Sequence, residues 1–413
     1  MNKNVQKNSQ NSLTVPKKRQ VRIKKPKINR DIVRDNDIVR IKGDIDRTFL
    51  ILVIILVCFG SVMVFSASYA YALSSKGNSY YFIQRQITFV AIGSVIMFII
   101  ANFVDYLQIK RMTGLIFTAI VIALVAVLIV GTAEGEAQRW LIIGKVGVQP
   151  SELMKLGLVL ALAKYYSDAE QYLFRRTTKW EPVWRRLLIP LMIVLFVCIL
   201  VALEKHFSGV IILFMIGVMV IFAGGGQLKF MIGAGASFAA VVGTAILLVP
   251  YARGRIDIWI HPENYSSQSE TWQTLQGLNA VGSGGFFGVG LGQSLQKHMF
   301  VSQPQNDFIF AIICEELGFV GAVATICLFI VLVWRGIVIA QKAPDTFSKL
   351  VVVGIMSKIA IQAILNMAVV TNTIPNTGIS LPFFSYGGSS LLMLFVEMGI
   401  VLCISRYSYP NKQ

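Results

Sequence analysis

Phe49-Leu-Ile-Leu-Val-Ile-Ile-Leu-Val-Cys-Phe-Gly-Ser-Val-Met-Val-Phe-Ser-Ala-Ser68 is the stretch of the sequence that decides the fold class. It carries no charged residue, and a helix of this length rises about 30 Å, which matches the hydrocarbon core of a bilayer. The whole chain is similar, with 55% hydrophobic and only 14% charged residues. Because a soluble domain has about a quarter of its residues charged, we expect an all-α polytopic membrane protein.

Further apolar runs follow, separated by polar segments, and they predict about ten transmembrane helices. The predicted spans are 48–70, 82–103, 113–131, 151–167, 187–203, 208–224, 229–250, 308–334, 350–371 and 385–405. With a cytoplasmic N-terminus, the tail and the loops on that side hold 27 of the 38 Lys and Arg residues. Cytoplasmic loops favour Lys and Arg, so we expect the N- and C-termini in the cytoplasm of a plasma-membrane protein.

The two ends of the chain are polar. Residues 1–47 carry fourteen Lys or Arg residues and five Asp residues but no aromatic residue. Without side chains that stack on bases, this segment is better interpreted as a disordered cytoplasmic tail near anionic lipid headgroups than as a nucleic-acid-binding arm. We expect the membrane domain to span 48–405 and a short cytoplasmic C-terminus to span 406–413.

The longest connection, 251–306, lies between the seventh and eighth predicted spans and is therefore expected to be extracellular. It is too polar to cross the membrane and too long for a bare connector, which is typical of a functional loop. Its glycine-rich part, Gly282–Gly292, lacks the Lys-Ser/Thr ending of a phosphate-binding loop. We expect a tight, close-packed surface turn or a re-entrant segment there.

Charged residues within spans are costly and usually functional. In Gln149-Pro-Ser-Glu-Leu-Met-Lys155, Pro150 suits the first turn of a helix, and Glu152 and Lys155 are three residues apart on one face. They could be a pair that only neutralises itself in the bundle or part of a site. Arg139-Trp140, just upstream, suits an interfacial anchor or a contact to an anion.

A second charged group is Asn306-Asp-Phe-Ile-Phe-Ala-Ile-Ile-Cys-Glu-Glu-Leu-Gly318. Asp307 stands at the outer mouth of a predicted helix, where it could be a helix cap or a catalytic carboxylate. Glu315 and Glu316 lie two to three turns deeper, so at least one is expected to face the bundle interior, with Lys358 as a candidate partner.

The third group is the segment 372–390, which combines prolines, glycines and hydroxyl side chains between two predicted spans. Irregular backbone at membrane depth is tolerated where protein buries it or a cavity wets it. Together the three groups predict an outward-open polar cavity, suited to an anionic, lipid-linked substrate that arrives from the outer leaflet.

Several motifs in a fixed order identify a resemblance. They are Val64–Ser68; Arg139-Trp140 with Gln149–Glu152 and Lys155; Trp272–Gln276, Gly282–Gly285, Gly290–Gly292 and Gln296-Lys297; Asn306–Ala311 with Glu315–Gly318; and Pro375–Gly378, Pro382 and Ser385–Ser389. The chain resembles the SEDS family of bacterial cell-wall polymerases, which includes FtsW, RodA and SpoVE. Val64–Ser68, Asn372–Gly378 and the basic tail are more similar to the FtsW and SpoVE branches than to RodA, and they favour FtsW.

The resemblance implies a ten-helix fold and peptidoglycan glycosyltransferase activity on lipid II. It also implies that the Asp at the position of Asp307 is essential and that Glu152 and Lys155 line the same cavity. A class B penicillin-binding protein, the transpeptidase, and other divisome proteins are the implied partners, and the division septum is the implied location.

Two motifs depart from the family pattern. After the fifth span the family often has Pro-Asp-x-Gly-Thr, whereas this chain has Glu204-Lys-His-Phe-Ser-Gly209. Before the essential Asp the family often has Leu-Pro-Glu, whereas this chain has Ser302-Gln-Pro-Gln-Asn-Asp307. No site is carried over to 204–209, and Asp307 is the more plausible lone carboxylate.

The resemblance implies an inverting transfer, in which pyrophosphate leaves and one base suffices. We predict that Asp307 accepts the proton of the acceptor hydroxyl. The other candidate site residues are cations for the pyrophosphate and polar cavity residues: Arg139, Lys155, Arg255, Lys297, Gln273, Glu152, Lys358 and Ser385. A divalent cation, Mg²⁺ or Mn²⁺, could share the charge, although the sequence contains no dedicated ligand cage.

Two other functions fit part of the pattern. A lipid II flippase or transporter would also use intramembrane charges and a lipid-facing cavity, but it does not need a base at the outer mouth. A non-catalytic scaffold would recruit the transpeptidase without making glycan.

Overall fold

The computed structural model describes residues 43–134, 137–143, 146–173, 184–248, 250–261, 270–298, 300–301 and 303–407. The predicted basic tail therefore lies outside the described residues except for 43–47, and the C-terminal segment is described only to Tyr407. All that follows concerns the unit Lys42–Gln413.

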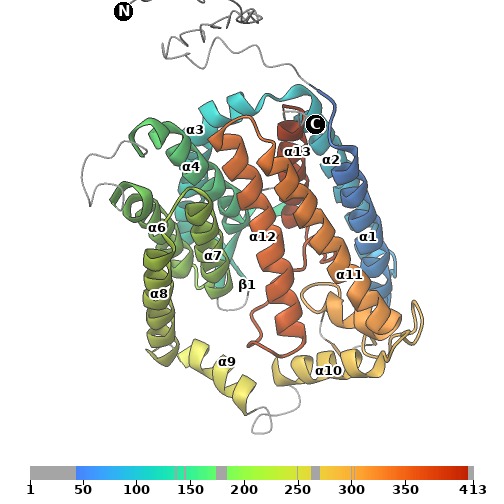
Figure 1. The fold of residues 1–413 in the computed structure, drawn as a ribbon. Helices are drawn as coiled ribbons and strands as arrows, with labels where there is room; N and C mark the ends of the chain where they lie inside the picture. The colour runs from blue at the N-terminus through green and yellow to red at the C-terminus, as the bar shows by residue number, and fades with distance from the viewer. Residues whose placement is uncertain are drawn as a thin grey trace, which may run out of the picture. The chain divides into compact units, whose positions relative to one another are not determined.

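Helices dominate this unit (Figure 1). They are α1 (Arg47–Lys76), α2 (Tyr81–Phe103), α3 (Tyr106–Val130), α4 (Pro150–Leu173), η1 (Trp184–Leu188), α6 (Ile189–Leu203), α7 (Phe207–Ala223), α8 (Leu228–Leu248), α9 (Pro250–Ile260), α10 (Glu270–Ser283), α11 (Ile309–Gln341), α12 (Thr346–Val370) and α13 (Gly388–Ser405).

Local sequence signals account for several helix ends. The Asp46 carboxylate accepts a hydrogen bond from Phe49 N at 2.9 Å and caps α1, which ends at Gly77 with φ 69°. Asp345 and Ser348 form a reciprocal capping box at the start of α12. Pro150 opens α4, where its missing N–H leaves no helical hydrogen bond unmade.

All ten predicted spans coincide with helices, which confirms the membrane-helical fold class. By length and composition, seven described helices can cross a bilayer: α1, α2, α3, α11, α12, α13 and the combined segment Arg185–Leu203. The shorter helix α7 and the first part of α8 are also apolar, whereas α4 contains Glu152, Lys155 and Lys164. The count of ten crossings and their direction stay predictions.

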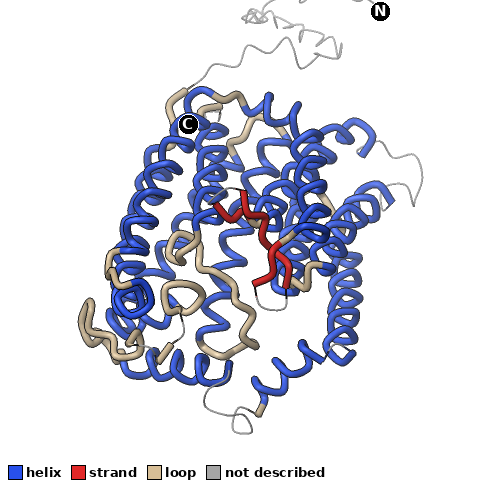
Figure 2. The backbone as a smooth tube through the Cα atoms, turned by 180° about the vertical axis from the view of Figure 1, so that it is seen from behind, coloured by secondary structure: helices blue, strands red, loops and turns tan. Residues whose placement is uncertain are grey.

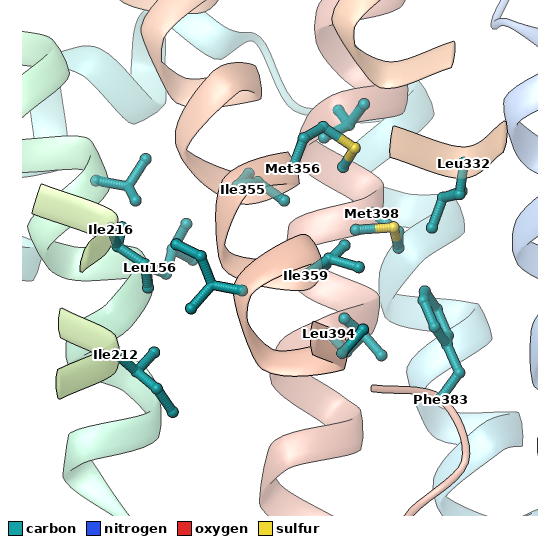
Figure 3. Close-up of a cluster of buried hydrophobic side chains, with 14 of the residues drawn as sticks. Leu156, Ile212, Ile216, Leu332, Ile355, Met356, Ile359, Phe383, Leu394 and Met398 are labelled. Atoms are coloured by element: carbon teal, nitrogen blue, oxygen red, sulfur yellow. The ribbon is translucent and has the colours of Figure 1, made fainter. Parts of the chain in front are cut away.

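Helix α12 forms the centre of the bundle, between α4 and α7 on one side and α11 and α13 on the other (Figure 1). In its most apolar stretch 72% of the residues are buried, against 22% in α2 and in α3. Figure 3 shows side chains from α4, α7, α11, α12 and α13 meeting around α12, among them Leu156, Ile216, Ile359 and Met398. Apolar residues are exposed on the outer helices, as expected where lipid replaces water as the solvent.

Two features were not predicted. The first is a small antiparallel sheet in the order β1-β2-β3, with β1 Thr132–Glu134, β2 Ala137–Ile143 and β3 Val146–Val148 (Figure 2). Trp140 pairs with Thr132 and Leu141 with Val148. The second feature is in the long loop 251–306, which contains two helices, α9 and α10, in place of a purely irregular connection.

The glycine-rich segment, predicted as a close-packed surface turn or a re-entrant segment, packs closely against α11. Helix α11 breaks at Gly318, which has φ 66° and ψ −162°. Val289 N and Gly290 N each donate to a carbonyl before the break, and Phe319 N and Val320 N after it donate to the segment. A side chain at Gly288 would collide with the Glu316 carbonyl, which explains the glycine. The backbone groups of the segment therefore provide hydrogen-bond partners for the backbone groups of α11 on both sides of the break.

Candidate active site

A cavity of about 460 Å³ lies where α4, α7, α11 and α13 begin. Its walls come from β2, those four helix starts, α10, α12 and the segment after α12. The lining residues are Arg139, Trp140, Gln149, Glu152, Lys155, His206, Ser208, Ile212, Gln273, Gln303, Asn306, Asp307, Gln362, Gly378, Ile379, Ser380, Tyr386, Gly387, Ser389 and Ser390. Residues from all three groups picked out from the sequence thus meet in one place, and the predicted candidates Arg139, Glu152, Lys155, Gln273 and Asp307 all line it.

The helix starts give this cavity an electrostatic character. The N-terminal N–H groups of a helix lack intrahelical partners and carry a partial positive charge. The N-cap residues of α7, α11 and α13 are His206, Phe308 and Gly387, and none of the three makes a side-chain capping hydrogen bond. Several helix dipoles therefore converge on a cavity that suits an anion.

Glu152 and Lys155 form an ion pair on the wall of the cavity. The Lys155 Nζ to Glu152 Oε1 distance is 2.6 Å, and the side chains of Lys155 and Glu152 are 2% and 11% exposed, respectively. The helical spacing of three residues places them on one face, as predicted. Both residues line the cavity, so the pair is buried in the bundle and still meets the space where a ligand would lie.

Asp307 lies in a turn that other segments hold in place. The Asn366 side chain is fully buried, and its Nδ2 donates to the carbonyls of Asp307 and Ile379, both at 2.7 Å. The Ser385 hydroxyl donates to Asn306 O at 2.6 Å and accepts from Leu381 N at 2.7 Å. These bonds tie the turn to α12 and to the irregular segment 372–390. Phe308 is the N-cap of α11, so Asp307 stands one residue before the capping position.

Arg139 projects from β2 at the rim of the cavity. Its Nη2 donates to Lys205 O at 3.0 Å, which links the small sheet to the connector between α6 and α7. Lys205 has φ 56°, so the connector turns sharply at this residue. The arginine therefore contributes a cation to the rim in a fixed position.

The connector 204–209 was not assigned a role from the sequence, yet it forms part of the wall. His206 and Ser208 line the cavity, and the Ser208 hydroxyl donates to Thr377 O. The His206 Nδ1 and Ser151 Oγ are 3.2 Å apart. Burial, with nearby Arg139 and Lys155, lowers the pKa of His206 to about 3, so the imidazole is neutral.

Glu204 in the same connector is 1% exposed, and among the described residues its two carboxylate oxygens have no hydrogen-bond partner. Burial raises the pKa of Glu204 to about 8, and the charge of Arg139 opposes part of that rise. One signal in the sequence could have found this connector. It lies at the outer ends of two predicted spans, on the same side as Glu152 and Asp307.

The other four predicted site residues are not among those that line the cavity. Lys358 and Ser385 line a small adjoining pocket with Glu152, and the Lys358 Nζ pairs with Glu397 Oε1 at 2.6 Å. Lys297 is fully buried and pairs with Glu316 Oε1 at 2.7 Å, so it does not reach the cavity. Arg255 belongs to α9, and its side chain lies outside the described residues.

The predicted partner of the buried glutamates was wrong. Glu315 and Glu316 both face the interior, at 2% and 0% exposure, but neither pairs with Lys358. Glu316 binds Lys297 and accepts from the Ser66 hydroxyl at 2.5 Å, and Glu315 accepts from Leu295 N at 2.9 Å. Because these contacts fasten the loop before α11 to the bundle, we infer an anchoring role for Lys297 in place of pyrophosphate binding.

The chain's own residues do not provide a metal cage in the part that the structure describes. No group of three or more His, Cys, Asp and Glu side chains converges there. Among its lining residues the cavity offers one carboxylate, Asp307, beside the Glu152–Lys155 ion pair.

The fold and the site define a polytopic membrane protein with a polar cavity at the starts of several helices. A family model named for FtsW, RodA and SpoVE, and described as "Cell cycle protein", matches residues 46–410. The chain belongs to this family.

Relatives and solved structures agree. The chain is 39% identical to "Stage V sporulation protein E" of Bacillus subtilis, over 88% of this chain and 97% of that protein. It is 35% identical to "Probable peptidoglycan glycosyltransferase FtsW" of Trichlorobacter lovleyi, over 88% and 93%. The RodA crystal structure from Thermus thermophilus matches with a TM-score of 0.65 at 26% identity, covering 89% of this chain and 98% of that one. A structure titled for a peptidoglycan synthase complex that coordinates polymerization and crosslinking matches with a TM-score of 0.72 at 26% identity, over 88% and 98%.

Proposed function

We propose that this protein is a peptidoglycan glycosyltransferase that polymerises lipid II into β-1,4 glycan strands at the outer face of the cytoplasmic membrane. One observation carries the proposal: Asp307 lies in a cavity ringed by helix starts, in a turn that Asn366 and Ser385 hold. Family membership and the names of the relatives support it. The positive-inside distribution of Lys and Arg supports the outward orientation.

In the proposed reaction Asp307 is the general base. The 4-hydroxyl of the acceptor sugar attacks the anomeric carbon of the donor, opposite the pyrophosphate. The new C–O bond forms as the bond to the pyrophosphate oxygen breaks, so the configuration inverts. The hydroxyl proton passes to the Asp307 carboxylate, and undecaprenyl pyrophosphate leaves with the electron pair. General-base assistance of this kind contributes about 10²–10⁴ in rate.

The leaving pyrophosphate needs positive charge rather than a second acid. Arg139 at the rim and Lys155 on the wall provide cations, and the first turns of α7, α11 and α13 provide N–H groups. A divalent cation, Mg²⁺ or Mn²⁺, stays a prediction. In this proposal it would arrive with the pyrophosphate, and chelation with EDTA during the assay tests it.

The partner and the place of action are also proposals. A similar chain occurs in a structure titled for a peptidoglycan synthase complex that couples polymerization with crosslinking. By analogy we propose a class B penicillin-binding protein as the partner of this chain. The family description "Cell cycle protein" supports a role in cell division, and we propose the septum and other divisome proteins with it.

The test uses purified wild-type protein and Asp307→Ala in detergent with lipid II, each with and without the partner. We expect glycan strands from the wild type with its partner and none from the variant. A variant that polymerises at the wild-type rate would refute the role of Asp307.

The same experiment separates the proposed enzyme from the two rival functions. Detergent removes the two sides of the membrane, so a flippase would give no product there, and a scaffold would bind the partner without making glycan. If the wild type with its partner makes no glycan while it still binds that partner, the proposed activity is refuted.

A further inference from the structure

A second cavity lies between α3 and α4. It has a volume of about 480 Å³, and its walls include Thr113, Gly114 and Phe117 from α3. From α4 they include Lys164, Tyr165 and Asp168. Lys164 follows Glu152 by twelve residues on α4, which is about 18 Å along the helix. The groove therefore opens towards the opposite leaflet from the active-site cavity.

Most polar groups of this groove already have partners within the protein. Lys110 Nζ lies 3.8 Å from Asp168 and donates to the Ser167 hydroxyl at 2.8 Å. The Thr113 hydroxyl donates to Ile109 O, and the Tyr165 hydroxyl to Arg185 O, both at 2.8 Å. These polar groups at the edge of the groove therefore have hydrogen-bond or ion-pair partners within the protein.

Lys164 differs from these groups. It is partly buried in the groove, and among the described residues no carboxylate lies within salt-bridge distance of its ammonium. A cation in this position is costly unless it meets an anion or extends to the headgroup region. Among the described residues Lys110 pairs with Asp168, while Lys164 pairs with no carboxylate, and this difference favours an anionic ligand at Lys164.

The shape of the groove suits a hydrocarbon chain. A side chain built at Gly114 would meet no atom within 4 Å, so the floor is open at this residue. Phe117, one turn further along α3, provides an apolar wall. A charged head beside an apolar channel is the chemistry of a phospholipid.

We propose that the groove between α3 and α4 binds one anionic phospholipid of the inner leaflet. The Lys164 ammonium contacts the lipid phosphate, and an acyl chain lies along Gly114 and Phe117. This site is separate from the proposed glycosyltransferase reaction and does not depend on it. A basic residue near an anionic headgroup strengthens binding by about fivefold.

The test is native mass spectrometry of the full-length, delipidated protein titrated with phosphatidylglycerol or with phosphatidylethanolamine. We expect one bound phosphatidylglycerol, held about fivefold more tightly than phosphatidylethanolamine. Lys164→Gln should abolish that preference and Lys164→Arg should keep it. Lys229→Gln, which changes an exposed lysine at the start of α8, is the matched control and should bind as the wild type does.

A second variant tests the apolar part. Gly114→Leu fills the open floor and should remove the bound lipid while the gel-filtration profile stays that of the wild type. The proposal is overturned if the wild type binds both lipids equally, since Lys164 would then only extend to the membrane surface. It is also overturned if Lys164→Gln keeps the preference.

Discussion

The pairs Glu152–Lys155 and Lys297–Glu316 have nearly the same geometry in different surroundings. Their Nζ to Oε1 distances are 2.6 Å and 2.7 Å. The first pair lines the active-site cavity, whereas the second is fully buried between the loop before α11 and α11 itself. One Lys–Glu ion pair thus lines a cavity that a ligand could occupy, and the other fastens a loop to the bundle. Only their surroundings distinguish the two pairs.

The largest loss of stability is expected from breaking the fully buried pair Lys297–Glu316. Lys297→Met leaves the Glu316 carboxylate buried without its cation, which costs about 3–5 kcal/mol in the free energy of unfolding. A thermal melt of the purified protein measures it, and the double variant Lys297→Met/Glu316→Gln should recover much of the loss. An unchanged melting temperature would show that the anchoring role is wrong.

Breaking the cavity pair should act mainly on function. Lys155→Met removes a cation from the proposed pyrophosphate site, and we expect lipid II polymerisation to fall about ten- to hundredfold. In this variant Glu152 can still be hydrated from the cavity, and it lies beside Lys358 in the small pocket. The melting temperature of Lys155→Met should therefore fall less than that of Lys297→Met. Equal losses of stability in the two variants would contradict the distinction between the pairs.

Asn366 tests whether the position of Asp307 matters as well as its charge. Asn366→Ala leaves the Asp307 and Ile379 carbonyls without their buried donor, which costs about 1–3 kcal/mol. We expect kcat to fall while KM changes little, because the base moves and the lining remains. A variant with wild-type kcat would show that this clamp is not needed.

Glu204 extends the comparison to a buried carboxyl outside the spans, with no hydrogen-bond partner among the described residues. Its pKa is raised from 4.5 to about 8 by burial, so the folded state favours the protonated form. The stability that this proton gives is complete below pH 4.5 and is lost as the pH rises towards 8.

Glu204→Gln should therefore be less sensitive to pH than the wild type. The difference between the unfolding free energies of Glu204→Gln and the wild type should grow between pH 6 and pH 8 by at most about 1.4 kcal/mol per pH unit. Above pH 8 this difference should stay constant. Melting temperatures across this range measure it. Parallel pH profiles would contradict a buried, protonated Glu204.

Local patterns in the sequence predicted what depends on neighbours along the chain. Apolar runs located the helices, and the spacing of Glu152 and Lys155 placed both on one helix face. Contacts between distant segments could not be predicted in this way. Lys297 and Lys358 find their partners 19 and 39 residues away, so the sequence showed their charge but not their surroundings. The role of Asn366 depends on where Asp307 and Ile379 meet in the fold.

The most direct test of the account is the initial rate of lipid II polymerisation by Asp307→Asn, with the partner present. This substitution keeps the size of the side chain and removes the base, and Asp257→Asn, at an exposed residue of α9, is the matched control. We predict a rate about 10²–10⁴ lower for Asp307→Asn, with an unchanged melting temperature and a fully active control. A folded Asp307→Asn protein that makes glycan at the wild-type rate would contradict the account.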